Sequence, residues 1–170
     1  MPLFTRRPAL PDPLRRSLDL PSDDKILATA QLADDGWLVA TRHALHVLPS
    51  TGERLTRPWA DIDRGTFDPE APAITVHWVT GDSDNYPLAP PTPVKFAQTF
   101  RERVQSSVVH VQKVQIPGAG TVQVALRRGA DGKLLTQVIG SPQVDLTDPG
   151  TLAVVDAAER DVRAAAGLRG

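Results

Sequence analysis

Seven short runs of β-forming residues lie between Lys25 and Leu88, and turn signals separate each run from the next. Alternation of apolar and polar residues over such short stretches is typical of half-buried strands. One turn signal is Asp34-Asp35-Gly36, where we expect the glycine to adopt the positive φ of a hairpin turn. The sequence therefore predicts antiparallel strands over residues 26–33, 37–41, 44–48, 54–59, 62–67, 73–80 and 85–88.

An amphipathic helix is expected directly after the last of these runs. Thr92 is a favourable N-cap residue, and Pro93 is a favourable residue for a first helical turn. Apolar residues then recur at helical spacing, at Phe96, Ala97, Phe100 and Val104. The pattern predicts a helix over residues 93–107.

Seven antiparallel strands followed by one helix form a specific order of elements. This order resembles the pleckstrin-homology-like superfold, in which a C-terminal helix caps a bent sheet or partly open barrel. The resemblance covers residues 25–109 and depends on the element order and on the positions of Trp37, Phe96 and Phe100. It implies a binding role without a particular ligand, because this superfold serves many functions.

A second, smaller unit is expected over residues 110–170. Three strands are predicted at 108–116, 122–127 and 134–139, followed by a loop at 140–147 that should be exposed. Asp148-Pro149 begins a last helix that should end at Gly167. Its expected buried face carries Leu152, Val155, Ala158, Val162 and Ala165. Such a βββα unit is small, so we expect it to pack on the first unit as one body. The fold class predicted for the whole chain is α+β, mostly β.

Residues 1–24 form a segment of different composition, an arm rich in proline and arginine. Four prolines fall within positions 2–13, and the arginines come in two pairs, Arg6-Arg7 and Arg15-Arg16. The prolines disfavour a long helix or a paired strand. Two interpretations remain open for the arm: a disordered tail, or a segment that becomes ordered only on another molecule.

Composition limits the function classes. Basic and acidic residues nearly balance, at 19 and 20, which disfavours a duplex nucleic-acid binder. The chain has no cysteine, so it forms no disulfide, no thiolate metal site and no cysteine nucleophile. Prolines and charges follow the twin arginine, so we expect no signal peptide and a cytoplasmic location. Arginine outnumbers lysine 15 to 4, which is typical of a GC-rich bacterial genome.

The patterns required for several common chemistries are missing from the sequence. His43 and His46 are three residues apart in a predicted strand region, so their side chains should point to opposite faces. The paired aspartates fall at predicted turns, where capping explains them, and no Gly-x-Ser-x-Gly motif occurs. The sequence predicts no catalytic residues, no cofactor and no metal site, and hence a protein that is not an enzyme.

Binding to another protein is the function that the sequence favours, either as a binding module or as an accessory subunit. The candidate partner-binding residues are apolar and basic side chains of the arm together with one tryptophan at a strand end: Phe4, Arg6, Arg7, Leu10, Leu14, Arg15, Arg16 and Trp59. Packing in the core is an alternative for Trp59.

Two alternatives stay open at this point. The first is a peripheral membrane adaptor that uses the basic arm, although four arginines give only weak attraction to an anionic surface. The second is a small enzyme whose site is assembled from residues distant in sequence.

Overall fold

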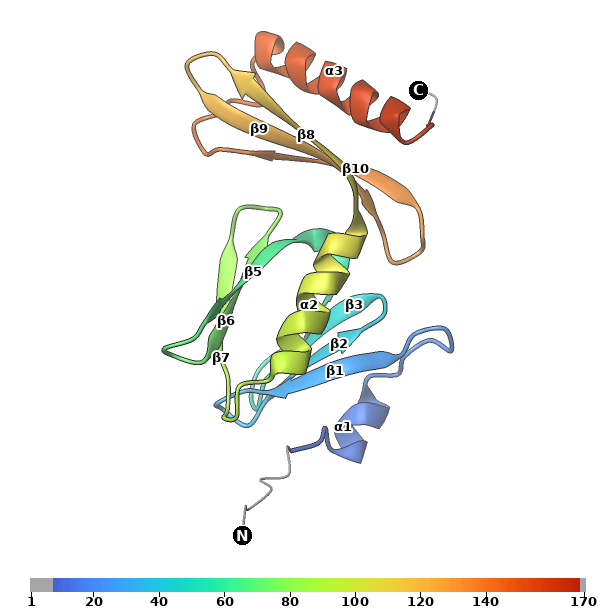
Figure 1. Ribbon diagram of the computed structural model, residues 1–170, viewed down its shortest axis with the longest axis vertical. Helices are drawn as coiled ribbons and strands as arrows, with labels where there is room; N and C mark the ends of the chain where they lie inside the picture. Colours follow the sequence, from blue (N-terminus) through green and yellow to red (C-terminus); the bar gives the residue numbers. More distant parts are fainter. Residues whose placement is uncertain (1–7, 169–170) are drawn as a thin grey trace.

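The computed structural model describes residues 8–168 and shows an α+β, mostly β architecture. Within these residues the strands form three antiparallel sheets, accompanied by three α-helices (Figure 1). Two sheets and the helix α2 make up the first unit, and the third sheet with α3 makes up the second. The predicted fold class is thus confirmed at this level.

The first sheet joins four strands in their sequence order: β1 (Ile26–Gln31), β2 (Trp37–Thr41), β3 (Ala44–Leu48) and β4 (Leu55–Pro58). The turn between β1 and β2 differs from the expectation in one respect. Asp35, and not Gly36, has the positive φ, at 68°. Gly36 is needed for space instead, because a Cβ there would lie 2.6 Å from the carbonyl oxygen of Leu48.

The second sheet follows a short 3-10 turn, η1 (Trp59–Asp61), and contains β5 (Ile62–Asp68), β6 (Ala73–Trp78) and β7 (Ser83–Pro87). The two sheets meet at one corner. There, Ala33 N donates to Pro87 O at 2.9 Å, and Ala89 N donates to Gln31 O at 2.9 Å. The predicted seven strands are therefore present, arranged as four plus three.

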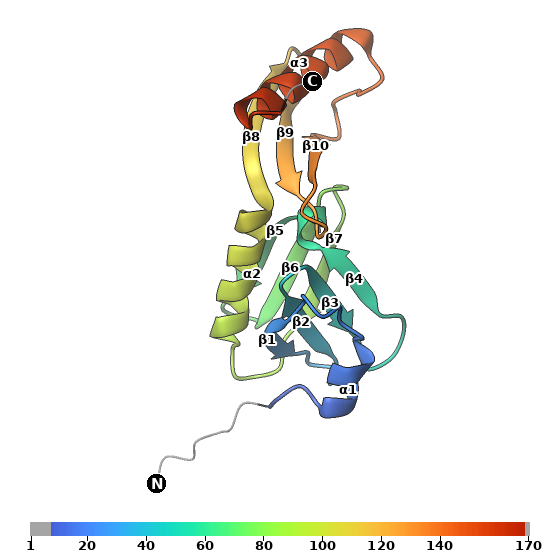
Figure 2. The ribbon, with the colours of Figure 1, turned by 90° about the vertical axis from the view of Figure 1, so that its right-hand side faces the viewer.

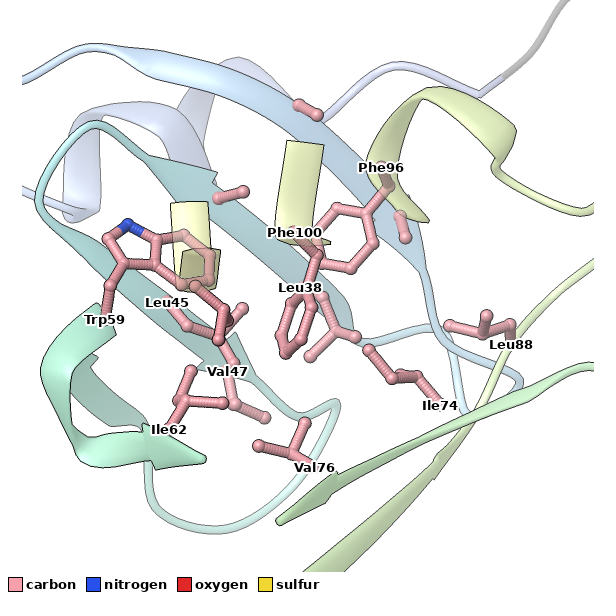
Figure 3. Packing of buried hydrophobic residues seen from close by; sticks show 14 of the residues in the cluster. Leu38, Leu45, Val47, Trp59, Ile62, Ile74, Val76, Leu88, Phe96 and Phe100 are labelled. Carbon is pink, nitrogen blue, oxygen red and sulfur yellow. The ribbon is translucent and has the colours of Figure 1, made fainter. Parts of the chain in front are cut away.

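Helix α2 (Val94–Ser107) lies across the open side between the two sheets and supplies their shared core. Phe96, Phe100 and Val104 point into that core, as the sequence predicted (Figure 3). Gly65 on β5 allows Phe100 to approach the strand, because a Cβ at this position would lie 2.4 Å from Phe100 Cε1. The ring of Phe100 also meets Trp59 edge-on, with 5.5 Å between the ring centroids.

The third sheet begins where α2 ends, without an intervening loop (Figure 2). Its strands β8 (Val108–Ile116), β9 (Gly120–Arg128) and β10 (Leu134–Gly140) form a meander with β9 at the centre. Helix α3 (Pro149–Ala165) covers one face of this sheet. The side chain of Asp148 accepts a hydrogen bond from Thr151 N at 2.8 Å, which confirms the expected helix start.

The buried face of α3 differs from the expected face at its ends. Val155, Ala158 and Val162 are buried as predicted, but Leu152 is 42% exposed and Ala165 is also exposed. Thr151 is buried instead. Each helical residue is rotated by about 100° from the one before it, so the step from Thr151 to Leu152 moves the leucine off the contact face.

A buried arginine connects the second unit to the first. Arg127 on β9 is 1% exposed, and its Nη1 donates to Ile62 O at 2.5 Å and to Ser107 Oγ at 3.4 Å. Its Nη2 lies 3.9 Å from Asp63 Oδ1. Gln137 on β10 adds a second link, since its Nε2 donates to Ala60 O at 2.7 Å. The junction between the units is therefore polar and hydrogen-bonded.

The described part of the arm, residues 8–24, packs on its own chain, which corrects the expectation that the arm is ordered only on another molecule. It contains the short helix α1 (Asp12–Ser17). Leu10 is 3% exposed and packs with Trp37, Val39 and Leu48, while Leu14 and Leu18 flank this cluster. Because the arm covers the outer face of the first sheet, β2 and β3 are buried on both faces.

Candidate functional site

The outer edge of β1 carries backbone groups that the first sheet does not use. Leu32 N donates to Gly36 O on the β2 side, whereas Gln31 O accepts from Ala89 N on the opposite side. Successive residues of an antiparallel strand point their N–H and C=O groups to alternate sides. Thr29 therefore presents its N–H and C=O away from β2, and no backbone partner within residues 8–168 meets them there.

A groove of about 320 Å³ follows this edge. The arm forms one wall through Pro8 and Arg15, and residues 89–96 form the other wall, up to the first turn of α2. The floor is β1 itself, from Ile26 to Gln31. Ala28 and Ala30 belong to the core as well as to this floor, whereas the side chains of Thr29 and Gln31 alternate to the other face of the strand.

The charge of the groove has one sign. Among residues 8–168, the ionisable side chains that line it are those of Arg15 from the arm and Lys95 from α2, and none of these described lining residues is a carboxylate. Both side chains are exposed. The groove thus combines an open strand edge with two cations that stand on opposite walls.

The sequence-predicted binding residues fall into three groups in the structure. Phe4, Arg6 and Arg7 lie outside the described residues. Arg15 lines the groove, and Arg16 is exposed on α1 without lining it. Leu10, Leu14 and Trp59 belong to hydrophobic clusters.

Burial changes the interpretation of Leu10 and Trp59 as partner-binding residues. Trp59 is 4% exposed, packs against Phe100, and donates from Nε1 to Thr41 O at 3.0 Å. Leu10 is buried between the arm, to which it belongs, and the first sheet. Both side chains contribute to the stability of the fold. The packing alternative for Trp59 is therefore the correct one.

Sequence reasoning missed Lys95, Thr29 and the groove itself. From sequence, Lys95 is only one residue of the helix predicted over 93–107, and Thr29 only one residue of the strand predicted over 26–33. The available signal was the pair of strands at residues 37–41 and 44–48, which are apolar except for Thr41 and His46, since such strands require cover on both faces. That cover is the arm, and it brings Arg15 to the edge of β1.

Two of the histidines, His43 and His46, hydrogen-bond to different partners. His43 sits in the turn after β2, with Nε2 3.1 Å from Asp23 Oδ2. His46 is buried in β3, with Nδ1 3.0 Å from Thr56 Oγ1. Within residues 8–168, no group of three or more histidine, aspartate or glutamate side chains is arranged to hold a metal ion.

Four ionisable groups among residues 8–168 have clearly shifted pKa values, and they lie in different elements. Burial lowers the pKa of His46, and the negative charge of Asp24 partly offsets this lowering. Burial, aided by Asp84, raises the pKa of Tyr86 to about 12. Burial also lowers the pKa of Arg127, against the raising effect of Asp63 and Asp61. Hydrogen bonds from Thr147 lower the pKa of the Asp145 carboxyl.

None of the helices in residues 8–168 combines the length and the apolar character needed to cross a bilayer.

Comparison with known proteins adds no relative. No protein-family model matches the chain, no curated protein matches it, and no solved structure matches it. The class that the chain itself defines is an α+β, mostly β protein with three antiparallel sheets, in which an arm, a strand edge and a helix enclose a cationic groove.

Proposed function

We propose that this chain is a non-enzymatic binding module with a pleckstrin-homology-like first unit, and that it acts by binding another protein. Its ligand is an extended, carboxylate-bearing segment of the partner, which adds as a strand along the outer edge of β1. The four-plus-three arrangement of the strands and the position of α2 support this assignment of the fold.

The observation that carries the proposal is the outward-facing backbone of Thr29 at the base of a cationic groove. An exposed strand edge is a template for pairing with another chain, and side-chain pockets beside it select the sequence. Ala89 already occupies the edge at Gln31, so the open part of β1 is Ile26–Ala30, which at about 3.3 Å per residue can pair with roughly 17 Å of extended peptide.

The positive charge of the groove selects peptides that carry acidic residues. Arg15 and Lys95 stand on the two walls, so a segment with acidic residues gains attraction from both sides, whereas a basic segment is repelled. The arm contributes to binding as a fixed wall that places Arg15, which favours a peptide ligand over the membrane surface that a free basic tail would suit.

Selection of a random peptide library on the full chain tests this proposal. We expect enriched peptides to be extended, acidic and free of proline at their centre. Arg15→Glu and Lys95→Glu should each reduce the affinity for a selected peptide by about tenfold, because each converts an attraction into a repulsion. Arg16→Glu is the matched control, since Arg16 neighbours Arg15 but does not line the groove.

The contribution of the Thr29 backbone N–H to peptide binding is tested with a separate pair of variants. Thr29→Pro removes the outward N–H, which an edge strand tolerates, and should also weaken peptide binding by about tenfold. Thr29→Val keeps the N–H and should bind like the wild type. Equal affinities for the Thr29→Pro and Thr29→Val proteins, or equal losses in the Arg15→Glu and Arg16→Glu proteins, would refute strand addition at this groove.

A further inference from the structure

A second concave site lies where the two units meet, and it shares no lining residue with the groove along β1. It is a cleft of about 230 Å³. Three arginines line it, and each comes from a different element: Arg42 from the turn between β2 and β3, Arg103 from α2, and Arg128 from the end of β9.

Hydrogen bonds to residues 23–25 fix the turn that carries Arg42. Arg42 N donates to Lys25 O at 3.0 Å, and Arg42 Nη1 donates to Asp23 O at 3.2 Å. Asp24 accepts from His43 N at 3.3 Å and from Thr41 Oγ1 at 2.9 Å. These bonds hold the first wall of the cleft in place.

The opposite wall is fixed by the junction between the units. Arg127 ties the end of β9 to Ile62 and Ser107, and Arg128 is the next residue along the chain. The loop after Arg128 is closed by two hydrogen bonds, from Gly129 N to Lys133 O at 2.8 Å and from Gly132 N to Gly129 O at 3.0 Å. The distance between the walls is therefore set by buried contacts and not by a loose hinge.

The electrostatic balance of the cleft is positive. Arg103 and Arg128 form no ion pair with any described residue, and no carboxylate of the described part of the chain lines the cleft. The carboxylate of Asp23 is engaged by His43 beside the cleft. The C-terminal end of α2 contributes about half an elementary charge of opposite sign, which three full positive charges exceed.

The donors available to a ligand are guanidinium groups. Ser106 Oγ and Ser107 Oγ also line the cleft, but each hydroxyl already donates to a carbonyl of its own helix. Guanidinium forks match the oxygen pairs of phosphate, and forks that come from three elements suit a tetrahedral anion better than a planar carboxylate. The volume is below the roughly 300–1,000 Å³ of pockets for drug-sized ligands, so the ligand is compact.

We propose that this cleft binds a compact phosphate group held by Arg42, Arg103 and Arg128. The site is independent of the peptide-binding role of the groove. A phosphate bound there contacts both units and therefore strengthens their junction.

Calorimetric titration of the full chain with inorganic pyrophosphate tests the site. We expect saturable binding of one pyrophosphate per chain, and a rise in melting temperature. Arg103→Gln and Arg128→Gln should each weaken that binding by about tenfold. Arg101→Gln is the matched control, because Arg101 is exposed on the same helix but does not line the cleft, and it should bind like the wild type.

Two outcomes would overturn the proposal. One is the absence of saturable pyrophosphate binding at millimolar concentration in the folded wild-type chain. The other is an equal loss of affinity in the Arg101→Gln and Arg103→Gln proteins, which would indicate only nonspecific attraction. A parallel experiment with phosphoinositide vesicles shows whether the phosphate belongs to a lipid headgroup or to a soluble molecule. Co-sedimentation with the vesicles that depends on Arg103 assigns the phosphate to a lipid headgroup. Pyrophosphate binding without co-sedimentation assigns it to a soluble ligand.

Discussion

The Phe100→Ala protein is expected to lose about 3–5 kcal/mol in its free energy of unfolding. Phe100 is 1% exposed at the centre of the core that both sheets of the first unit share. Its ring meets Trp59 and Phe67 edge-on, and it fills the space that Gly65 leaves open. Removing the ring leaves a cavity that the surrounding strands cannot close. Urea denaturation followed by tryptophan fluorescence and by circular dichroism measures the loss.

Val94→Ala is the matched control for Phe100→Ala. Val94 begins the same helix but is 63% exposed, so its truncation should change the free energy of unfolding by less than about 0.5 kcal/mol. A loss in the Phe100→Ala protein as small as that of the control would show that α2 does not hold the two sheets together as described.

Arg127→Ala should lower the free energy of unfolding by about 3 kcal/mol and should make the two units unfold separately. The substitution leaves the carbonyl of Ile62 without its donor and removes the cation 3.9 Å from Asp63, which keeps Arg64 at 3.0 Å as its other partner. Differential scanning calorimetry should then show two transitions, or one broadened transition, where the wild type shows one.

Two further variants separate the charge from the packing at this position. Arg127→Met restores most of the side-chain volume but not the hydrogen bonds, so its loss should lie between those of the wild type and Arg127→Ala. Arg128→Ala removes the exposed neighbour and should cost less than about 0.5 kcal/mol. A single sharp transition with unchanged stability in the Arg127→Ala protein would contradict the role of Arg127 as the link between the units.

The elements of this chain could be predicted from sequence because they depend on local patterns. Alternation and turn signals located the ten strands of residues 8–168, and Asp148 marked the start of α3. Local patterns failed where the geometry depends on a distant contact. Gly36 illustrates this, since the carbonyl of Leu48 across the hairpin, and not its own φ, requires the glycine.

The candidate site was less predictable than the fold. The composition of the arm indicates Arg15 as a candidate, but its position depends on where the arm packs. The packing of Leu10 against Trp37 and Val39 fixes that position. Lys95 and Thr29 reach the same groove only after α2 has crossed the edge of β1. No short-range spacing links these three residues, so their proximity follows from tertiary packing alone.

Backbone amide hydrogen exchange of β1, with and without a selected acidic peptide, measures strand addition directly. We expect the peptide to slow exchange at Thr29, while Ala28 and Ala30, whose amides face β2, keep their rates. Protection that appears elsewhere, with the exchange rate of Thr29 unchanged by saturating peptide, would contradict a binding function at the β1 edge.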